Sequence, residues 1–456
     1  MENYSSLVTK QKSFFRSGKT KDISFRIEAL QKLRIAIQNH EDDLLKALKI
    51  DLNKSEFEAY TTEIGILLSE ISFILSNLKS WVKPEKVKTP MTHVGTTGYI
   101  NSEPYGVTLI IAPWNYPFQL AIAPLIGAIA AGNCAIIKPS ELTPKTSGVL
   151  AKLIQETFEE EYISAILGGV ETSTALLNES LDYIFFTGSV SVGKIIMEAA
   201  AKHLTPVTLE LGGKSPTIVH EDAKLKLAAK RIAWGKFINA GQTCVAPDYV
   251  YVHQSIKTEF LNELKKAIHE LYGDIPLQNE DYTHIVSEKH FNRLQSFLNN
   301  GSIYTGGKTK SEGLIIEPTV LTDITWEDPV MQDEIFGPIL PILNYSNLSE
   351  VIEGIQHHPK PLALYIFSED MNIQQKVLNS VSFGGGCIND TVYHLSSPYL
   401  PFGGVGPSGS GAYHGKASFD TFSHKKSILK QTTLFDIPFR YPNVKNGLKK
   451  IKMFLK

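Results

Sequence analysis

Residues 105–138, YGVTLIIAPWNYPFQLAIAPLIGAIAAGNCAIIK, decide the fold class. The runs 107–112 and 134–138 are apolar and rich in isoleucine, and we predict a β-strand for each. The segment from Gln119 to Ala131, between the two runs, is apolar over the length of a helix. A strand, a helix and a second strand form a βαβ unit, whose parallel strands are buried on both faces and therefore read as continuous apolar runs.

An alternative for this stretch is a membrane span, because residues 105–137 carry no charge and a spanning helix needs about 20 apolar residues. Prolines and glycines divide the stretch into short pieces, namely Pro113, Pro117, Pro124, Gly127 and Gly132. Proline interrupts helices, so we favour the buried βαβ unit.

The rest of the chain alternates between the same kinds of element. Apolar residues three and four positions apart predict helices over the first eighty residues. Downstream, we predict helices at 145–158, 194–203 and 223–239, and strands at 163–167, 182–186, 207–211, 216–219, 249–253, 314–320 and 339–345. Such alternation is typical of a parallel α/β sheet, and the 456 residues exceed what one core of about 250–300 residues holds. We therefore predict two α/β domains, with an exposed β-ribbon at residues 92–102.

The composition excludes several classes of protein. Lys and Arg total 45 and Asp and Glu total 47, whereas a nucleic-acid binder would show a basic excess. Three cysteines without a C-x-x-C pair exclude a disulfide scaffold and a Cys-based zinc site, and they suit a reducing compartment. The N-terminus lacks the basic start and apolar segment of a signal peptide, so we do not expect export. The tail 442–456 is basic and weakly amphipathic, and we expect it to be solvated or packed on a partner, with a membrane-surface role as a weaker alternative.

Two glycine-rich segments compete for a phosphate-binding role. Gly404-x-Gly406-x-x-Gly409 matches the dinucleotide fingerprint by letter but lacks its strand-turn-helix context, so we interpret it as a flexible loop. The turn Thr187–Gly193 follows a predicted strand and precedes a helix, whose N-terminus would suit a diphosphate. At the position of Ile195, the P-loop of a nucleoside triphosphatase carries a Ser or Thr whose hydroxyl binds magnesium, so the sequence disfavours a P-loop nucleoside triphosphatase. On spacing alone, a purely structural turn is an equal alternative.

Cys244, in the sequence NAGQTCVAP, is a candidate nucleophile because it lies in an irregular link between a helix and a strand. Cys134 lies within the apolar strand and is expected to be core. The sequence GGGCIN around Cys387 does not indicate whether this cysteine is buried or exposed. A single cysteine is more often structural than catalytic, so the sequence alone leaves this open.

Two polar residues stand out beside these cysteines. Glu210 ends an apolar strand and precedes two glycines. A buried carboxylate is costly unless it is paired or functional, and burial would raise its pKa toward the range of a general base. Asn115 lies between two prolines, and a side-chain amide can stabilise an oxyanion. The alternatives are a salt-bridged or exposed glutamate and a turn-forming asparagine.

Six motifs, in this order along the chain, resemble those of the aldehyde dehydrogenase family: PWNYP (113–117), KPSE (138–141), FTGSVSVG (186–193), LELGGKSP (209–216), GQTC (241–244) and EIFGP (334–338). The segment PFGGVGPSGSGAYHGK (401–416) extends the resemblance toward the C-terminus. The short N-terminus, the APDY after Cys244 and the GAYHGK segment resemble the class 3 branch, which includes fatty and aromatic aldehyde dehydrogenases. Some members of that branch carry a C-terminal membrane anchor, from which this lysine-interrupted tail departs.

The resemblance implies a role for each matched residue. Cys244 attacks the aldehyde, Asn115 and the Cys244 backbone N–H hold the oxyanion, and Glu210 activates the water that hydrolyses the thioester. The cofactor is NAD, with NADP as a second candidate. The residues implied in binding it are Trp114 in PWNYP, Lys138 and Glu141 near the adenosine ribose, Gly188, Ser189 and Gly193 by the diphosphate, Glu334 on the nicotinamide ribose, and Phe336 beside it.

The resemblance also implies an α/β architecture with a Rossmann-like cofactor domain, a catalytic α/β domain and a ribbon that joins subunits. We assign residues 1–80 and 102–209 to the dinucleotide-binding domain and residues 210–400 to the catalytic domain. Residues 81–101 and 401–456 form the oligomerisation ribbon and the C-terminal tail. We expect a cytoplasmic homodimer that acts on a small-molecule aldehyde, with no nucleic-acid partner, no metal and no transmembrane segment.

Three other functions stay open at this stage. A cysteine esterase or hydrolase would need no cofactor, but no histidine lies in a recognisable Cys–His motif. A non-catalytic dinucleotide-binding protein would bind cofactor without turnover. An acylating relative would pass the thioester to coenzyme A, which the water-activating Glu210 argues against. The identity of the aldehyde cannot be deduced from the sequence.

Overall fold

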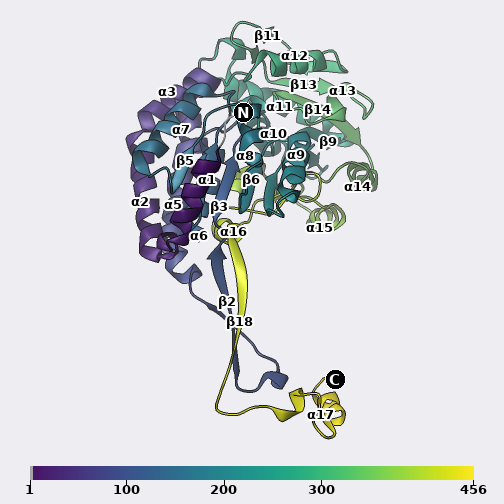
Figure 1. The fold of residues 1–456 in the computed structure, drawn as a ribbon. Helices are drawn as coiled ribbons and strands as arrows, with labels where there is room; N and C mark the ends of the chain where they lie inside the picture. The colour runs from purple at the N-terminus through teal and green to yellow at the C-terminus, as the bar shows by residue number, and fades with distance from the viewer. Residues whose placement is uncertain (1–3, 456) are drawn as a thin grey trace.

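The computed structural model describes residues 4–455. Residues 1–3 and Lys456, which begin the predicted helical region and end the basic tail, lie outside the described residues. The described chain forms a body built on two large sheets and an arm that projects from it (Figure 1). No helix in this part of the chain is long and apolar enough to cross a membrane.

The first sheet contains the βαβ unit that the sequence predicts. Its strand order is β17–β7–β6–β3–β4–β5, and β3 to β7 pair in parallel. Every residue of β3 and β4 is buried, as the apolar runs predict. The strands are β3 (Val107–Ile111), β4 (Cys134–Lys138), β5 (Ile163–Ala165), β6 (Tyr183–Thr187), β7 (Val207–Glu210) and β17 (Gly409–Ser410), and the helices between them are α6 (Gln119–Ala131), α7 (Pro144–Thr157), α8 (Val170–Leu177) and α9 (Val190–Ala201).

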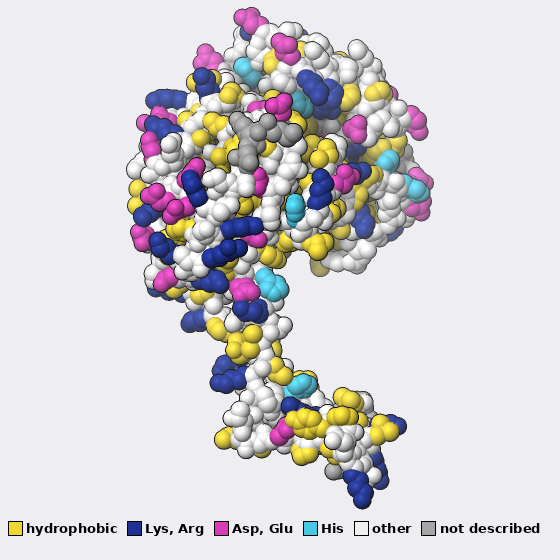
Figure 2. Space-filling model, in the orientation of Figure 1, with side chains coloured by type: hydrophobic (Ala, Val, Ile, Leu, Met, Phe, Trp, Pro, Cys, Tyr) yellow, Lys and Arg dark blue, Asp and Glu magenta, His cyan; other side chains and the backbone are white. Residues whose placement is uncertain are grey.

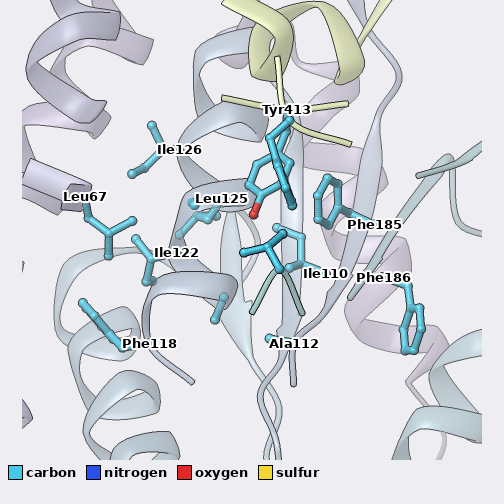
Figure 3. Close-up of a cluster of buried hydrophobic side chains, with 14 of the residues drawn as sticks. Leu67, Ile110, Ala112, Phe118, Ile122, Leu125, Ile126, Phe185, Phe186 and Tyr413 are labelled. Atoms are coloured by element: carbon cyan, nitrogen blue, oxygen red, sulfur yellow. The ribbon is translucent and has the colours of Figure 1, made fainter. Parts of the chain in front are cut away.

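Helices from the N-terminal region cover the first sheet. Leu67 of α5, Phe118, and Ile122, Leu125 and Ile126 of α6 gather beside the strand residue Ile110 (Figure 3). Gln119–Ala131 therefore packs as a core helix, buried at almost every position. The N-terminal elements are α1 (Ser5–Arg16), α2 (Ile23–Asn39), α3 (Glu41–Leu52), α4 (Glu56–Ala59), a π-turn at Tyr60–Ile64 and α5 (Gly65–Trp81).

The second sheet has seven strands in the order β10–β13–β14–β9–β8–β15–β16, parallel except for the edge strand β10. Its strands are β8 (Pro216–Val219), β9 (Tyr249–His253), β10 (Ser302–Thr305), β13 (Thr319–Thr322), β14 (Ile339–Tyr345), β15 (Ala363–Phe367) and β16 (Gly385–Ile388). Its helices are α10 (Leu225–Phe237), α11 (Lys257–Tyr272), α12 (Glu288–Phe297), α13 (Pro329–Gln332), α14 (Leu348–Gln356) and α15 (Met371–Ser380). Both sheets are mainly parallel and flanked by helices, which confirms the predicted α/β class.

Several predicted boundaries differ from the structure. The single strand predicted at 314–320 is two strands, β12 (Ile315–Ile316), which pairs with β11 (Thr309–Lys310), and β13. Pro318 separates them, because proline has no N–H for a sheet ladder. The helix predicted to reach Asn239 ends at Phe237. The strands β15 and β16 were not predicted.

The segment 404–409 is a loop over most of its length, as we predicted, but its last residue lies in a strand. Gly409 and Ser410 form β17, which pairs antiparallel with β7 opposite Glu210 and Leu209. Gly409 has φ +147°, and a Cβ there would lie 2.3 Å from the carbonyl oxygen of Leu209. The glycine therefore serves close packing of two backbones rather than flexibility.

The arm is an antiparallel ribbon of β1 (Glu85–Val87), β2 (Thr96–Pro104) and β18 (Ser423–Gln431), ending in α17 (Gly447–Phe454) (Figure 1). Of the ribbon predicted at 92–102, residues 96–102 lie in β2 and residues 92–95 precede it, and its long partner β18 was not predicted. Residues 401–422, grouped by sequence with the ribbon and tail, include α16 (Lys416–Thr421) and pack on the first sheet before the ribbon begins.

Candidate active site

The carboxyl ends of the parallel strands in the first sheet carry most of the candidate residues. Asn115 follows β3, Gly188 follows β6, and Glu210 is the last residue of β7. β3 has β4 on one side and β6 on the other, so the strand order reverses between β3 and β6. Ligands of open parallel sheets bind outside the strand ends at such a reversal.

Cys244 lies between α10 and β9 as predicted, and the turn that precedes it has unusual backbone angles. Asn239 and Ala240 have φ of 53° and 49°, in the left-handed region. Each such non-glycine residue costs about 1–3 kcal/mol and persists only where its surroundings hold it. Gly241 continues the left-handed run with φ +72°, and a Cβ there would lie 2.2 Å from the carbonyl oxygen of Gly337.

The side chain of Gln242 is the main restraint on this turn. Its Nε2 donates hydrogen bonds to the carbonyl oxygens of Asn239 (3.1 Å) and His284 (3.0 Å). Its Oε1 accepts one from the backbone N–H of Val286 (3.1 Å). Because both ends of the amide are bonded, the position of the turn, and with it that of Cys244, is fixed by the packed segment 284–286.

The Cys244 thiol is partly buried, and its surroundings favour the protonated form at rest. Burial raises the pKa of Cys244, and the nearby carboxyl groups of Glu334 and Glu210 raise it further. The backbone N–H groups of Cys244 and Val245 act in the opposite direction. A nucleophile with a raised pKa requires a base to take its proton during attack.

Glu210 is buried and unpaired. Its side chain is 3% exposed, and neither carboxyl oxygen has a hydrogen-bond partner within the described chain. Burial raises the pKa of Glu210 well above its ordinary value. Within the described part of the chain, Glu210 is therefore neither salt-bridged nor exposed, which were the two alternatives for it. Its backbone is anchored, because the carbonyl oxygen accepts a hydrogen bond from the Gly188 N–H (3.0 Å).

Asn115 is buried beside the cysteine turn rather than exposed in a simple proline turn. Its Nδ2 donates a hydrogen bond to the carbonyl oxygen of Gln242 (3.0 Å). That bond uses one of the two amide hydrogens and sets the orientation of the other. The structure thus brings together Asn115, the Cys244 turn and, through its electrostatic effect on the thiol, Glu210.

Trp114, Glu334 and Phe336 meet where the two sheets approach each other. The rings of Trp114 and Phe336 lie edge to face with centroids 5.3 Å apart, and Phe336 has a left-handed φ of 50°. A Cβ on Gly212 would lie 1.9 Å from Oε2 of Glu334, which favours a glycine at this position, two residues after the end of β7. Burial and Asp248 together raise the pKa of Glu334 to about 8.

The diphosphate candidates lie at the start of α9. The Ser189 side chain caps the helix by accepting a hydrogen bond from the Val192 N–H. Gly193 is buried in the helix, where a Cβ would lie 2.7 Å from Leu211. Gly193 therefore allows the helix to pack closely on the sheet, and the N-terminus of the helix, which follows Gly188, is suited to bind an anion.

Lys138 and Glu141 form an ion pair at the end of β4. Lys138 Nζ lies 2.9 Å from Glu141 Oε2, and the Lys138 side chain is almost fully buried whereas Glu141 is about half exposed. Partial burial opposes ionisation of Glu141, but the hydrogen bond from Lys138, a backbone hydrogen bond and the charge of Lys138 together outweigh it and lower the pKa of Glu141. A helix N-terminus, a charged pair and an aromatic pair around a strand-order reversal fit a dinucleotide.

The other two cysteines lie in different settings. Cys134 is fully buried in β4, and burial raises its pKa to about 12. Cys387 is partly buried, with its Sγ 3.5 Å from Nδ1 of His394. This thiol–imidazole contact at Cys387 was not indicated by any sequence motif. Burial lowers the pKa of His394 to about 4, so this imidazole is neutral near pH 7.

Sequence reasoning missed the residues that hold the site together. Lys54 and Glu63 form a fully buried ion pair, and Lys236 is a fully buried lysine. Lys214 pairs with Asp248 (2.6 Å), which also accepts the Ile335 N–H beside Glu334. For Glu63 a signal exists, because it takes an apolar-face position between Ala59 and Leu67 in a helical pattern.

Comparison with known proteins decides the family. The model of the aldehyde dehydrogenase family matches residues 2–428. The chain belongs to the aldehyde dehydrogenase family. It is 54% identical to a 4,4'-diaponeurosporen-aldehyde dehydrogenase of Staphylococcus aureus, over 98% of this chain and 97% of the relative. It is 46% identical to a mouse aldehyde dehydrogenase described as dimeric and NADP-preferring, over 94% and 95% of the two chains.

The solved structures agree with the fold. A structure described as the substrate-bound state of Staphylococcus aureus AldH superposes with a TM-score of 0.98 at 53% identity, covering 100% of both chains. The enzyme is thus an oxidoreductase that oxidises aldehydes with NAD or NADP as cofactor. The cofactor-independent hydrolase and the non-catalytic binding protein are set aside, and the predicted family resemblance is confirmed.

Proposed function

We propose that Cys244, Asn115 and Glu210 carry the oxidation of the aldehyde to a carboxylic acid. The Cys244 sulfur attacks the carbonyl carbon as the thiol gives up its proton to solvent water, which forms a carbon–sulfur bond and places negative charge on the carbonyl oxygen. The free N–H of the Asn115 amide and the backbone N–H of Cys244 donate hydrogen bonds to that oxygen. Donors preorganised in a water-poor site lower the barrier, and losing one costs about 10²–10³-fold in kcat.

The bound nicotinamide supplies the hydride acceptor, so that a thioester on Cys244 remains. Glu210 then takes a proton from a water molecule that attacks the thioester carbonyl. The carbon–sulfur bond breaks, the acid leaves, and Glu210 returns the proton to the sulfur, which restores the thiol and the carboxylate. A carboxyl whose pKa is raised by burial holds a proton more strongly than an exposed one, which suits a general base near neutral pH.

One observation carries this proposal: a buried carboxyl with no partner in the described chain lies near enough to a thiol on a strained turn to raise the pKa of that thiol. The direct test compares three cysteine variants. We expect Cys244→Ala to abolish aldehyde oxidation, whereas Cys134→Ala and Cys387→Ala keep most of it. Near-normal turnover by Cys244→Ala would contradict the mechanism.

We propose that the cofactor lies across the carboxyl ends of β3 and β6. The α9 N-terminus with Gly188 and Ser189 would hold the diphosphate, and Lys138 and Glu141 the adenosine ribose. Glu334 would hold the nicotinamide ribose, with Trp114 and Phe336 packed beside it. Residues 1–80 and 102–209 would then form the cofactor domain, and residues 210–400 the catalytic domain.

We propose that the substrates are apolar aldehydes. A small cavity has an apolar side formed by Ile66, Leu67, Ala123, Leu395 and Pro398, and a polar side formed by Ser69, Glu70, Gln119, Ser396, Ser397 and His414. Gln119 bonds to Tyr413, whose pKa both Glu210 and Cys244 raise, so the cavity borders the site. A series of aliphatic aldehydes tests this: kcat/KM should rise with chain length, and a preference for short or charged aldehydes would oppose it.

We propose a homodimer joined through the arm, in a reducing compartment such as the cytoplasm. The arm exposes apolar side chains on a narrow extension, seen as yellow patches among blue lysines in Figure 2, including Val94, Leu429 and Leu434. Such patches mark interfaces. Leu429→Asp with Leu434→Asp should give monomers in sedimentation measurements, whereas an unchanged dimer would place the interface elsewhere.

All three cysteines are free, which suits a reducing compartment.

A further inference from the structure

The N-terminal helical region places a fully buried ion pair against the loop that carries Asn115. Lys54 lies between α3 and α4, and Glu63 lies in the π-turn before α5. Both side chains have no exposed surface, and Lys54 Nζ lies 2.5 Å from Glu63 Oε1. Burying two charges is costly, and the protein recovers the cost only where further hydrogen bonds complete the pair.

Those further bonds go to the loop between β3 and α6. Lys54 Nζ also donates to the backbone carbonyl oxygen of Asn115 (3.0 Å) and lies 4.1 Å from the ring centroid of Tyr116. Glu63 Oε2 accepts the backbone N–H groups of Phe118 (3.0 Å) and Gln119 (3.1 Å) at the start of α6. The lysine thus holds the loop at its beginning and the glutamate holds it at its end.

The loop held in this way is bonded across to the cysteine turn. Asn239 Nδ2 donates to the Asn115 carbonyl oxygen (2.8 Å) and to the Gln242 carbonyl oxygen (3.0 Å), which also accepts Asn115 Nδ2. The Tyr116 hydroxyl lies 2.6 Å from Thr243 Oγ1. The Asn115 carbonyl oxygen is therefore shared by two donors, one from the buried pair and one from the cysteine turn.

We propose that Lys54 and Glu63 are positioning residues, which aim the Asn115 amide at the aldehyde oxygen by fixing the backbone of its loop. This inference rests on the proposed role of Asn115 as oxyanion donor. Both side chains are fully buried, so they act through the loop that they hold rather than by contact with the substrate. A displacement of about 1 Å in a catalytic group can cost roughly a hundredfold in rate, and a loop that loses its buried clamp would shift on that scale.

The effect of the buried pair on the position of the loop can be separated from its effect on the stability of the fold. A buried pair can often be replaced by apolar residues without loss of stability, whereas removing one partner strands a charge. Lys54→Met with Glu63→Leu therefore serves as a folded variant without the clamp. Lys32→Met is the matched control, because Lys32 forms an exposed pair with Glu28 on α2, away from the site.

The experiment measures kcat, the KM for cofactor and the rate of Cys244 alkylation by iodoacetamide in full-length enzyme. We expect the apolar double variant to lose at least about tenfold in kcat, with cofactor KM and alkylation rate within twofold of the wild type. The Lys32→Met variant should match the wild type in all three. Lys54→Met alone should lose kcat similarly if it folds, and the double variant decides if it does not.

A double-mutant cycle with Asn115→Ala separates this inference from the function on which it rests. Because the pair acts through Asn115, removing the pair from the Asn115→Ala enzyme should cost no further kcat. Independent, additive losses would overturn the positioning role, as would wild-type kcat in the double variant. If Asn115→Ala itself kept full kcat, the oxyanion role would fail first, and this inference with it.

Discussion

Replacing Glu210 by Gln should separate the first half of the reaction from thioester hydrolysis. The carboxyl is 3% exposed and unpartnered, and its pKa is raised by burial, so its ionised form is a strong base toward water. The amide of Gln fills the same space and takes no proton. A positioned general base contributes about 10²–10⁴-fold, which is about 3–5 kcal/mol at 1.36 kcal/mol per factor of ten.

The assay is stopped-flow absorbance of the reduced nicotinamide. We expect Glu210→Gln to release one equivalent of reduced cofactor per subunit in a burst. Its steady-state turnover should then be about 10²–10⁴-fold slower than that of the wild type. The acyl-enzyme accumulates because its hydrolysis has lost the base. Equal slowing of the burst and the steady state would mean that Glu210 acts mainly on Cys244, and unchanged turnover would refute the role altogether.

The same variant has a stability signature whose sign follows from the pKa. The unfolded glutamate ionises near 4.5, whereas the native carboxyl stays protonated to higher pH. Wild-type stability therefore falls as pH rises through this window, by about 1.4 kcal/mol for each unit of upward shift. In thermal unfolding, the stability of Glu210→Gln relative to the wild type should increase as the pH rises above about 4.5, and a difference that is constant with pH would contradict the burial.

Three further substitutions test other parts of the account. Glu141→Gln removes the carboxylate that would repel a 2′-phosphate, so the ratio of kcat/KM for NADP to that for NAD should rise; an unchanged ratio would show that Glu141 only pairs with Lys138. Lys236→Met removes a fully buried ammonium whose pKa is lowered to about 8, so at pH 7 the variant should be more stable by up to roughly 3 kcal/mol. Because the wild type sheds that proton above pH 8, the gap should shrink toward pH 10, and denaturant unfolding at both pH values checks this. Tyr116→Phe removes the hydrogen bond to Thr243 and should lower the free energy of unfolding by about 0.5–1.5 kcal/mol in the same measurement, with no loss meaning that the bond adds nothing.

The sequence predicted the parts of the fold that depend on local patterns. The strands at 107–111 and 134–138 and the helix between them follow from apolar runs of different length, because burial on both faces leaves no other residue type there. Glu210 stood out for the same reason, since a carboxylate conflicts with an apolar strand. β18 could not be predicted, because its lysine-rich sequence pairs with β2 across more than three hundred residues.

The supports of the site were beyond sequence reasoning because they are non-local. From the sequence alone, Lys54 resembles a surface lysine that follows a helix. Its hydrogen bond to the Asn115 carbonyl oxygen depends on the tertiary fold. Cys387 and His394 are close in sequence without a known motif, and their contact depends on the turn after β16. The roles of Cys244 and Glu334 came from family resemblance, whereas the strain before Cys244 and the clash that keeps Gly212 a glycine are visible only in the structure.

The central claim is that the reaction passes through a thioester on Cys244. It is tested most directly by incubating Glu210→Gln with aldehyde and cofactor, quenching with acid and measuring the peptides by mass spectrometry. We predict an added mass equal to the aldehyde less two hydrogen atoms, on the peptide that contains Cys244, and only when cofactor is present. An acyl group on Cys134 or Cys387, or an unmodified Cys244 after the burst, would contradict the account.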